Sequence, residues 1–134
     1  MKGKKRENLE EKAREVFCRY PIVKLAYLFG SQAQGLAGRQ SDFDFAVYAA
    51  EKNPARLFDL KLELLGKLGK IFGEDKIDVV ILNTARQPEL KYNIIKDGRL
   101  IYEKEPFKLL VEPRILNEYF DFHAQLLRYG LTKA

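Results

Sequence analysis

The sequence contains one cysteine and one histidine, and it has no long apolar run. Because Cys18 has no second cysteine to pair with, an intrachain disulfide is excluded, which favours an intracellular setting. A membrane-spanning helix needs about 20 apolar residues, and charged residues interrupt every apolar run well before that length. The start, MKGKKRENLEEK, is basic but has no apolar segment behind it, unlike a secretory signal. We therefore expect a cytoplasmic protein without a membrane segment.

The composition is that of a globular chain, with 46% apolar and 32% charged residues among 134. This length suits one core, so we expect a single domain over residues 1–134, with 105–134 as a C-terminal helical segment. The net charge of +5 would favour an anionic partner, but four of the basic residues lie within the first six positions. The aromatic residues show no base-stacking pattern, so we expect no direct nucleic-acid binding.

Hydrophobic periodicity predicts helices that alternate with strands. Asn8 is expected to cap the first helix, Asn53-Pro54 to begin the second, and Gly98 to end the third. The predicted helices are 8–19, 54–69, 87–97 and 114–128, and the predicted strands are 22–29, 42–48, 76–82 and 99–103. This order indicates an α/β (α+β) fold, a small mixed β-sheet flanked by helices, but it does not give the order of the strands.

Two acidic residues, Asp42 and Asp44, are two positions apart at the start of the second predicted strand. Side chains two apart on a strand share a face, so these carboxylates lie side by side while Phe43 and Phe45 point into the core. Neighbouring carboxylates repel each other unless a cation lies between them. Oxygen ligands of this kind suit Mg²⁺, so the pair predicts a magnesium site.

Asp78 is the only charged residue within the apolar strand IDVVIL, where an unpaired charge would be costly. If that strand neighbours the strand of Asp42 and Asp44, three carboxylates converge and can hold two Mg²⁺ ions for a phosphoryl displacement. Gly30 and Ser31 follow the first strand. A glycine lets the backbone approach a phosphate closely, and the serine adds a hydroxyl and an N–H, so both are candidates for binding nucleotide phosphates.

The pattern Gly30-Ser31, ten residues, then Asp42-x-Asp44 resembles the signature of the DNA polymerase β-like nucleotidyltransferases. Together with the short chain, it is similar to the minimal nucleotidyltransferases (MNT) that are antitoxins in HEPN–MNT toxin–antitoxin pairs. The resemblance implies a polymerase β-like fold and Asp42, Asp44 and Asp78 as metal-binding catalytic residues. It also implies that Gly30 and Ser31 bind the phosphates of ATP, and that AMP is transferred to a tyrosine of a HEPN ribonuclease toxin.

Two other functions stay open at this point: a non-catalytic antitoxin that neutralises its partner by binding alone, and nucleotidyl transfer to a small molecule. The apolar and aromatic residues between 107 and 129 form a band that is wide for a helix sealing a small core. We therefore expect this segment to serve as an interface with the partner or in a homodimer.

Overall fold

The computed structural model describes residues 2–30 and 43–131. These residues form eight elements in the predicted order of helix and strand. The elements are α1 (Lys2–Cys18), β1 (Val23–Phe29), β2 (Phe43–Ala49), α2 (Pro54–Phe72), β3 (Ile77–Ile81), α3 (Pro88–Asp97), β4 (Arg99–Glu103) and α4 (Phe107–Arg128). In this part of the chain no helix is long and apolar enough to cross a membrane.

The four strands form one mixed sheet in the order β3-β2-β1-β4. β1 lies antiparallel to both β2 and β4, whereas β2 and β3 are parallel. A parallel pair needs a long crossover connection, which α2 supplies between β2 and β3. The predicted mixed sheet is therefore confirmed, and its order places β1 and β2 at the centre.

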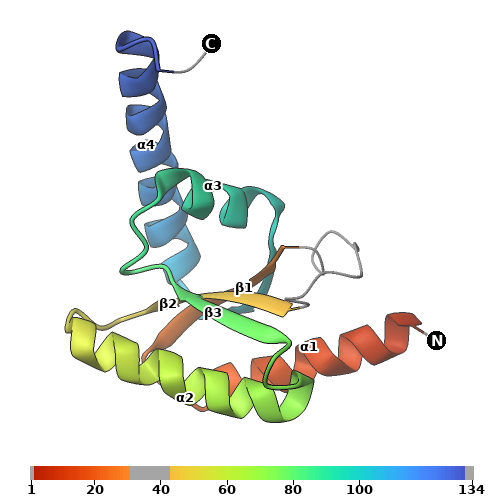
Figure 1. Ribbon diagram of the computed structural model, residues 1–134. Coiled ribbons are helices and arrows are strands. Elements are labelled where there is room, and N and C mark those ends of the chain that lie inside the picture. The colour runs from red at the N-terminus through yellow and green to blue at the C-terminus, as the bar shows by residue number, and fades with distance from the viewer. Residues whose placement is uncertain (1, 31–42, 132–134) are drawn as a thin grey trace.

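Helices cover both faces of the sheet (Figure 1). On one face, α1 and α2 bury a core in which Phe17, Phe45 and Leu64 are fully buried. On the other face, α3 and α4 cover a smaller core that contains Leu25, Tyr27 and Ile94, and the far half of α4 runs past α3 away from the sheet (Figure 1). The alternation of side chains along each strand supplies both cores.

Two helix starts predicted from the sequence are wrong. α1 begins at Lys2, so Asn8 lies inside the helix and does not cap it, because the segment before it contains good helix formers and no proline. α4 begins at Phe107 and contains Pro113 in its interior. Proline removes the bond to the carbonyl four residues earlier, here that of Leu109, which is exposed, so water can satisfy it.

The second helix follows its sequence signals closely at its start and runs three residues further at its end. The Asn53 side chain accepts a hydrogen bond from the Ala55 N–H at 2.9 Å, and Pro54 occupies the first turn, as predicted. The helix ends at Phe72, where Gly73 has a φ of 105° and its N–H bonds the Gly69 carbonyl. The chain then passes through a short turn into β3, whose second residue is Asp78.

Candidate active site

Two of the predicted carboxylates lie side by side where β2 and β3 begin. Asp44 and Asp78 are Cα partners in the parallel β2–β3 ladder. Their strand neighbours Phe45 and Val79 are buried on the opposite face of the sheet, against α1 and α2. The condition on which the sequence prediction depended, that these two strands are neighbours, is therefore confirmed.

The end of β1 brings Gly30 against Asp44, the member of the pair on the neighbouring strand β2. Phe29 is the Cα partner of Asp44, and Gly30 follows it with a φ of 80°, a conformation that L residues with a side chain rarely adopt. A Cβ atom built on Gly30 would overlap Oδ2 of Asp44. Only glycine allows this approach, so the backbone of the Gly30 turn lies directly against the Asp44 carboxylate.

The two carboxylates differ in their surroundings. Asp44 is half-buried, whereas Asp78 is exposed and its Oδ1 accepts a hydrogen bond from the Val79 N–H at 2.9 Å. That bond holds the Asp78 side chain near the backbone and leaves its second oxygen, Oδ2, available. An exposed and a half-buried carboxylate in register suit a charged ligand that enters from solvent.

The remaining predicted site residues, Ser31 and Asp42, lie outside the described residues. They are the chain neighbours of Gly30 and Phe43, whose positions are described. Within residues 2–30 and 43–131, no three His, Cys, Asp or Glu side chains gather to hold a metal. The structure thus brings together Gly30, Asp44 and Asp78, a set whose carboxylate oxygens fit a hard cation such as Mg²⁺.

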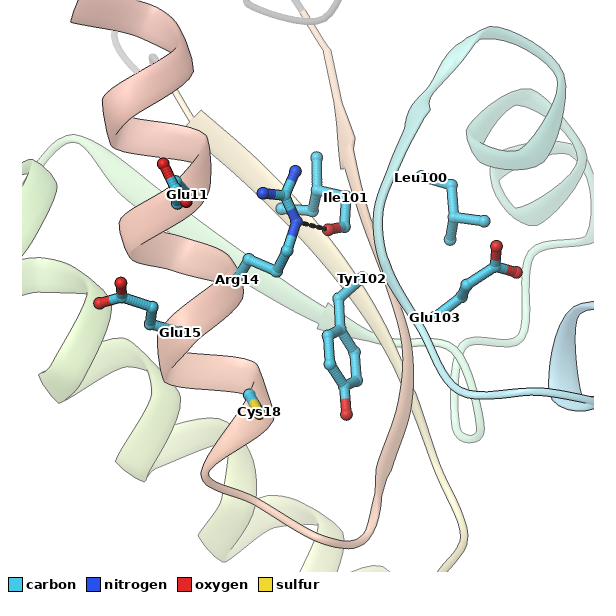
Figure 2. Close-up of a pocket in the computed structure, with 8 residues that line it drawn as sticks. All are labelled: Glu11, Arg14, Glu15, Cys18, Leu100, Ile101, Tyr102 and Glu103. Atoms are coloured by element: carbon cyan, nitrogen blue, oxygen red, sulfur yellow. Dashed lines mark hydrogen bonds between the residues drawn. The ribbon is translucent and has the colours of Figure 1, made fainter.

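A hollow lies elsewhere, between α1 and the edge strand β4 (Figure 2). It measures about 570 Å³, and Arg14 spans it to donate from Nε to the Ile101 carbonyl at 2.7 Å. Burial raises the pKa of the Tyr102 hydroxyl, which lines this hollow. None of the site residues lines it, and β4 is at the opposite edge of the sheet from β3, so it is not the candidate active site.

The sequence analysis missed a group on α3 that lies on the same face of the sheet as the carboxylates. The ring of Tyr92 stacks on Tyr119 of α4, with centroids 3.9 Å apart, and the Lys96 Nζ lies 5.7 Å from the Tyr92 centroid. Lys91, which is buried, bonds Glu118 at 2.8 Å. The four-residue spacing of Tyr92 and Lys96 is a signal in the sequence, because residues four apart lie on the same side of a helix.

Comparisons with known proteins agree with this geometry. Residues 11–107 match the family model described as "Polymerase beta, Nucleotidyltransferase". A protein adenylyltransferase MntA of Aphanizomenon flos-aquae is 36% identical over 106 residues, which cover 72% of this chain and 67% of that protein. The MntA of Shewanella oneidensis is 32% identical over 107 residues, which cover 78% and 72%.

Solved structures give the same result. A toxin–antitoxin complex of MntA in a doubly substituted variant is similar with a TM-score of 0.74 and 26% identity, covering 90% of this chain and 94% of that one. A toxin–antitoxin structure with AMP-PNP has a TM-score of 0.71 and 28% identity, covering 92% and 94%. From the sheet, the placement of Gly30 beside Asp44 and Asp78, and these matches, we conclude that the chain belongs to the polymerase beta nucleotidyltransferase family.

Proposed function

We propose that this chain transfers AMP from ATP to a tyrosine hydroxyl of a partner HEPN ribonuclease toxin and thereby acts as its antitoxin. The observation that carries the proposal is the in-register pair Asp44 and Asp78 beside the Gly30 turn. Relatives of this chain are named protein adenylyltransferases, and a related toxin–antitoxin structure contains AMP-PNP, an ATP analogue. These names support a protein as the acceptor and ATP as the donor.

We assign the catalytic and metal-binding roles to Asp42, Asp44 and Asp78. Bound Mg²⁺ ions, two in our proposal, would supply positive charge against the phosphate oxygens. Gly30 and Ser31 would contact the triphosphate. The Gly30 backbone can do so closely because it has no Cβ, and the close fit of Gly30 to Asp44 keeps phosphate and carboxylates in one place.

The proposed reaction is an in-line displacement at the α-phosphorus. A bond forms between the tyrosine oxygen and the α-phosphorus, the bond from that phosphorus to the bridging α,β-oxygen breaks, and pyrophosphate leaves. The tyrosine proton passes to solvent or to a carboxylate. We place Asp78 on the acceptor side because it is the more exposed of the pair, and Asp44 between Asp78 and the phosphate turn.

We propose that the reaction takes place in the cytoplasm, where ATP is available, and that residues 1–134 act as one domain. α4 belongs to that domain through Val111 and Ile115, which are buried in the α3–α4 core. The rest of α4 is less buried, in keeping with the C-terminal segment 105–134 as a distinct helical part.

The test is transfer of label from α-³²P-ATP to a HEPN toxin protein, either one found in a neighbouring gene or the toxin of a related MntA pair. Asp44→Asn and Asp78→Asn should each reduce transfer by at least about 100-fold, since each removes a charge placed where transition-state charge is balanced. Asp75→Asn, an exposed aspartate three residues before Asp78, is the matched control and should transfer like the wild type. Transfer by Asp44→Asn at the wild-type rate would refute the assignment.

The same variants separate catalysis from binding alone. If AMP transfer neutralises the toxin, Asp44→Asn should bind the HEPN protein yet leave its ribonuclease active. If binding is sufficient, Asp44→Asn will inhibit the ribonuclease as well as the wild type does, and the adenylylation proposal fails. Transfer of label to an aminoglycoside in the absence of the HEPN protein would instead support the small-molecule function.

A further inference from the structure

In the described part of the chain, most of the large exposed apolar side chains lie on α4 and the residues just after it. Within the described residues, six of the eight exposed large hydrophobic side chains lie between positions 109 and 131. The other two, Phe58 and Leu62, are on α2, on the opposite side of the sheet. The six are Leu109, Leu110, Phe120, Leu127, Tyr129 and Leu131. A concentration of this kind usually marks an interaction surface.

The spacing on α4 is that of a helix-packing seam. Apolar residues recur at steps of four, three, four and three, the pattern by which one helix packs along another. We call the set the α4 seam; it consists of Ile115, Tyr119, Phe122, Leu126 and Tyr129, together with the exposed Leu127 beside Leu126. Burial falls along it, from 6% exposed at Ile115 to 70% exposed at Tyr129. The far end of the seam is on the part of α4 that runs past α3 (Figure 1).

Contacts within the domain hold the near half of α4 in place. The Tyr27 hydroxyl donates to Glu112 Oε2 at 2.5 Å, and Lys91 bonds Glu118 at 2.8 Å. The Tyr92 ring stacks on Tyr119 and meets Phe120 edge-on, and Phe122 lines a hollow beside α3. Beyond these contacts, Leu127 and Tyr129 are exposed at the far end of an anchored helix.

We propose that the far half of the α4 seam docks a helix of the acceptor protein and so brings its hydroxyl to the carboxylates. This inference rests on the proposed function. Asp44 lies on the same sheet face as Ala46, which packs in the α3–α4 core, so a protein docked on α4 stands on the side where the carboxylates open. In this proposal a helix of the acceptor packs against α4 and contacts its apolar side chains at heptad spacing.

The size of the seam favours an acceptor protein over a second copy of this chain. Even the whole seam, fourteen residue steps at 1.5 Å, is only about 21 Å long, and on a helix about 10 Å wide it offers at most on the order of 200 Å² of contact plane. A stable interface needs about 800 Å² per partner. Two copies that meet only at α4 fall short, whereas an acceptor that also reaches Asp44 and Asp78 makes contact over more of the same face.

The test uses titration calorimetry to measure the affinity for the same HEPN protein of the full wild-type chain and of its Leu127→Glu, Tyr129→Glu and double variants. Each single variant should bind at least about 10-fold more weakly and the double variant at least about 30-fold, since a charge replaces an apolar anchor. Phe58→Glu and Leu62→Glu are matched controls, because these residues are similarly exposed but on the other face; both should bind within about 2-fold of wild type. Melting temperatures should stay near that of the wild type.

AMP transfer provides the second readout. At saturating HEPN protein the double variant should turn over at the wild-type kcat with a raised KM, because docking and not chemistry is impaired. Wild-type affinity in the double variant overturns the docking proposal while leaving the adenylylation proposal intact. Conversely, weakened binding with no transfer by the wild-type chain supports docking and refutes adenylylation. A wild-type chain that sediments as a dimer, and becomes monomeric in the double variant, would assign the seam to a second copy and overturn the proposal.

Discussion

The Gly30 turn depends on a single missing methyl group. With φ at 80°, any side chain strains the backbone by about 1 kcal/mol or more, and its Cβ would collide with the Asp44 carboxylate. We predict that Gly30→Ala lowers AMP transfer by at least about 100-fold, because the carboxylate is displaced from its place beside the phosphates. The measurement is kcat/KM for ATP together with a thermal melt.

Gly66 supplies the control for that substitution. It lies in the middle of α2, and nothing stands within 4 Å of where its Cβ would be. Gly66→Ala should stabilise the protein by about 0.5–1 kcal/mol, since alanine is the better helix former, and should not alter transfer. If Gly30→Ala behaves like Gly66→Ala in the transfer assay, the close approach at Gly30 has no catalytic meaning.

Ser31 should contribute to triphosphate binding and not to covalent chemistry. We predict that Ser31→Ala weakens ATP use by about 10- to 100-fold, as expected when one or two hydrogen bonds to a charged group are lost. No nucleotidylated Ser31 should form during turnover. Detection of a stable AMP adduct on Ser31 by mass spectrometry would contradict direct transfer.

Among the elements, α4 is tied to the sheet by one buried hydroxyl. Tyr27 of β1 is 2% exposed, and it donates to Glu112 of α4. We predict that Tyr27→Phe lowers the free energy of unfolding by about 1–2 kcal/mol, the usual cost of losing a hydrogen bond to a carboxylate. Urea unfolding at pH 7 measures this, with Tyr129→Phe, whose ring is exposed, as the control that should change little.

The same pair predicts a pH dependence. Burial, and then the bond to the Glu112 carboxylate, raises the pKa of Tyr27 above its ordinary value of about 10. A raised folded pKa stabilises the fold fully below pH 10, and this contribution is lost as pH rises further, because the unfolded tyrosine ionises first. The difference in unfolding free energy between wild type and Tyr27→Phe should therefore shrink above pH 10. A difference that stays constant from pH 7 to pH 11 would contradict this.

For the whole molecule, the sheet places like charges together, so the proposed Mg²⁺ site would link folding to metal binding. Asp44 and Asp78 are 34 residues apart in the chain and become neighbours only in the folded state. Mg²⁺ should therefore raise the melting temperature. At a Mg²⁺ concentration about ten times its dissociation constant, binding should add about 1.4 kcal/mol to the free energy of unfolding. We predict that Asp44→Asn abolishes this rise and Asp75→Asn keeps it. An equal Mg²⁺ shift in wild type and Asp44→Asn would place the ion elsewhere.

The amino-acid sequence by itself determined what depends on neighbours along the chain. The alternation in residues 43–47 predicted which side chains of β2 enter the core, because the period of a strand is a local property. Asn53-Pro54 likewise predicted the start of α2, since a cap is formed by adjacent residues. Gly30 and Asp44 could be chosen as candidates because their spacing matches a known signature, and Asp78 because it is the one charged residue within an apolar strand.

Only the tertiary structure decided what depends on long-range packing. Periodicity could not place β3 beside β2, because hydrogen bonds between strands join residues that no local pattern connects. It also misplaced the start of α4, because packing of Val111 and Ile115 on the sheet outweighs the cost of Pro113 within the helix. The collision that excludes a side chain at Gly30 exists only once β1 and β2 are paired, since it involves an atom of Asp44 on the neighbouring strand.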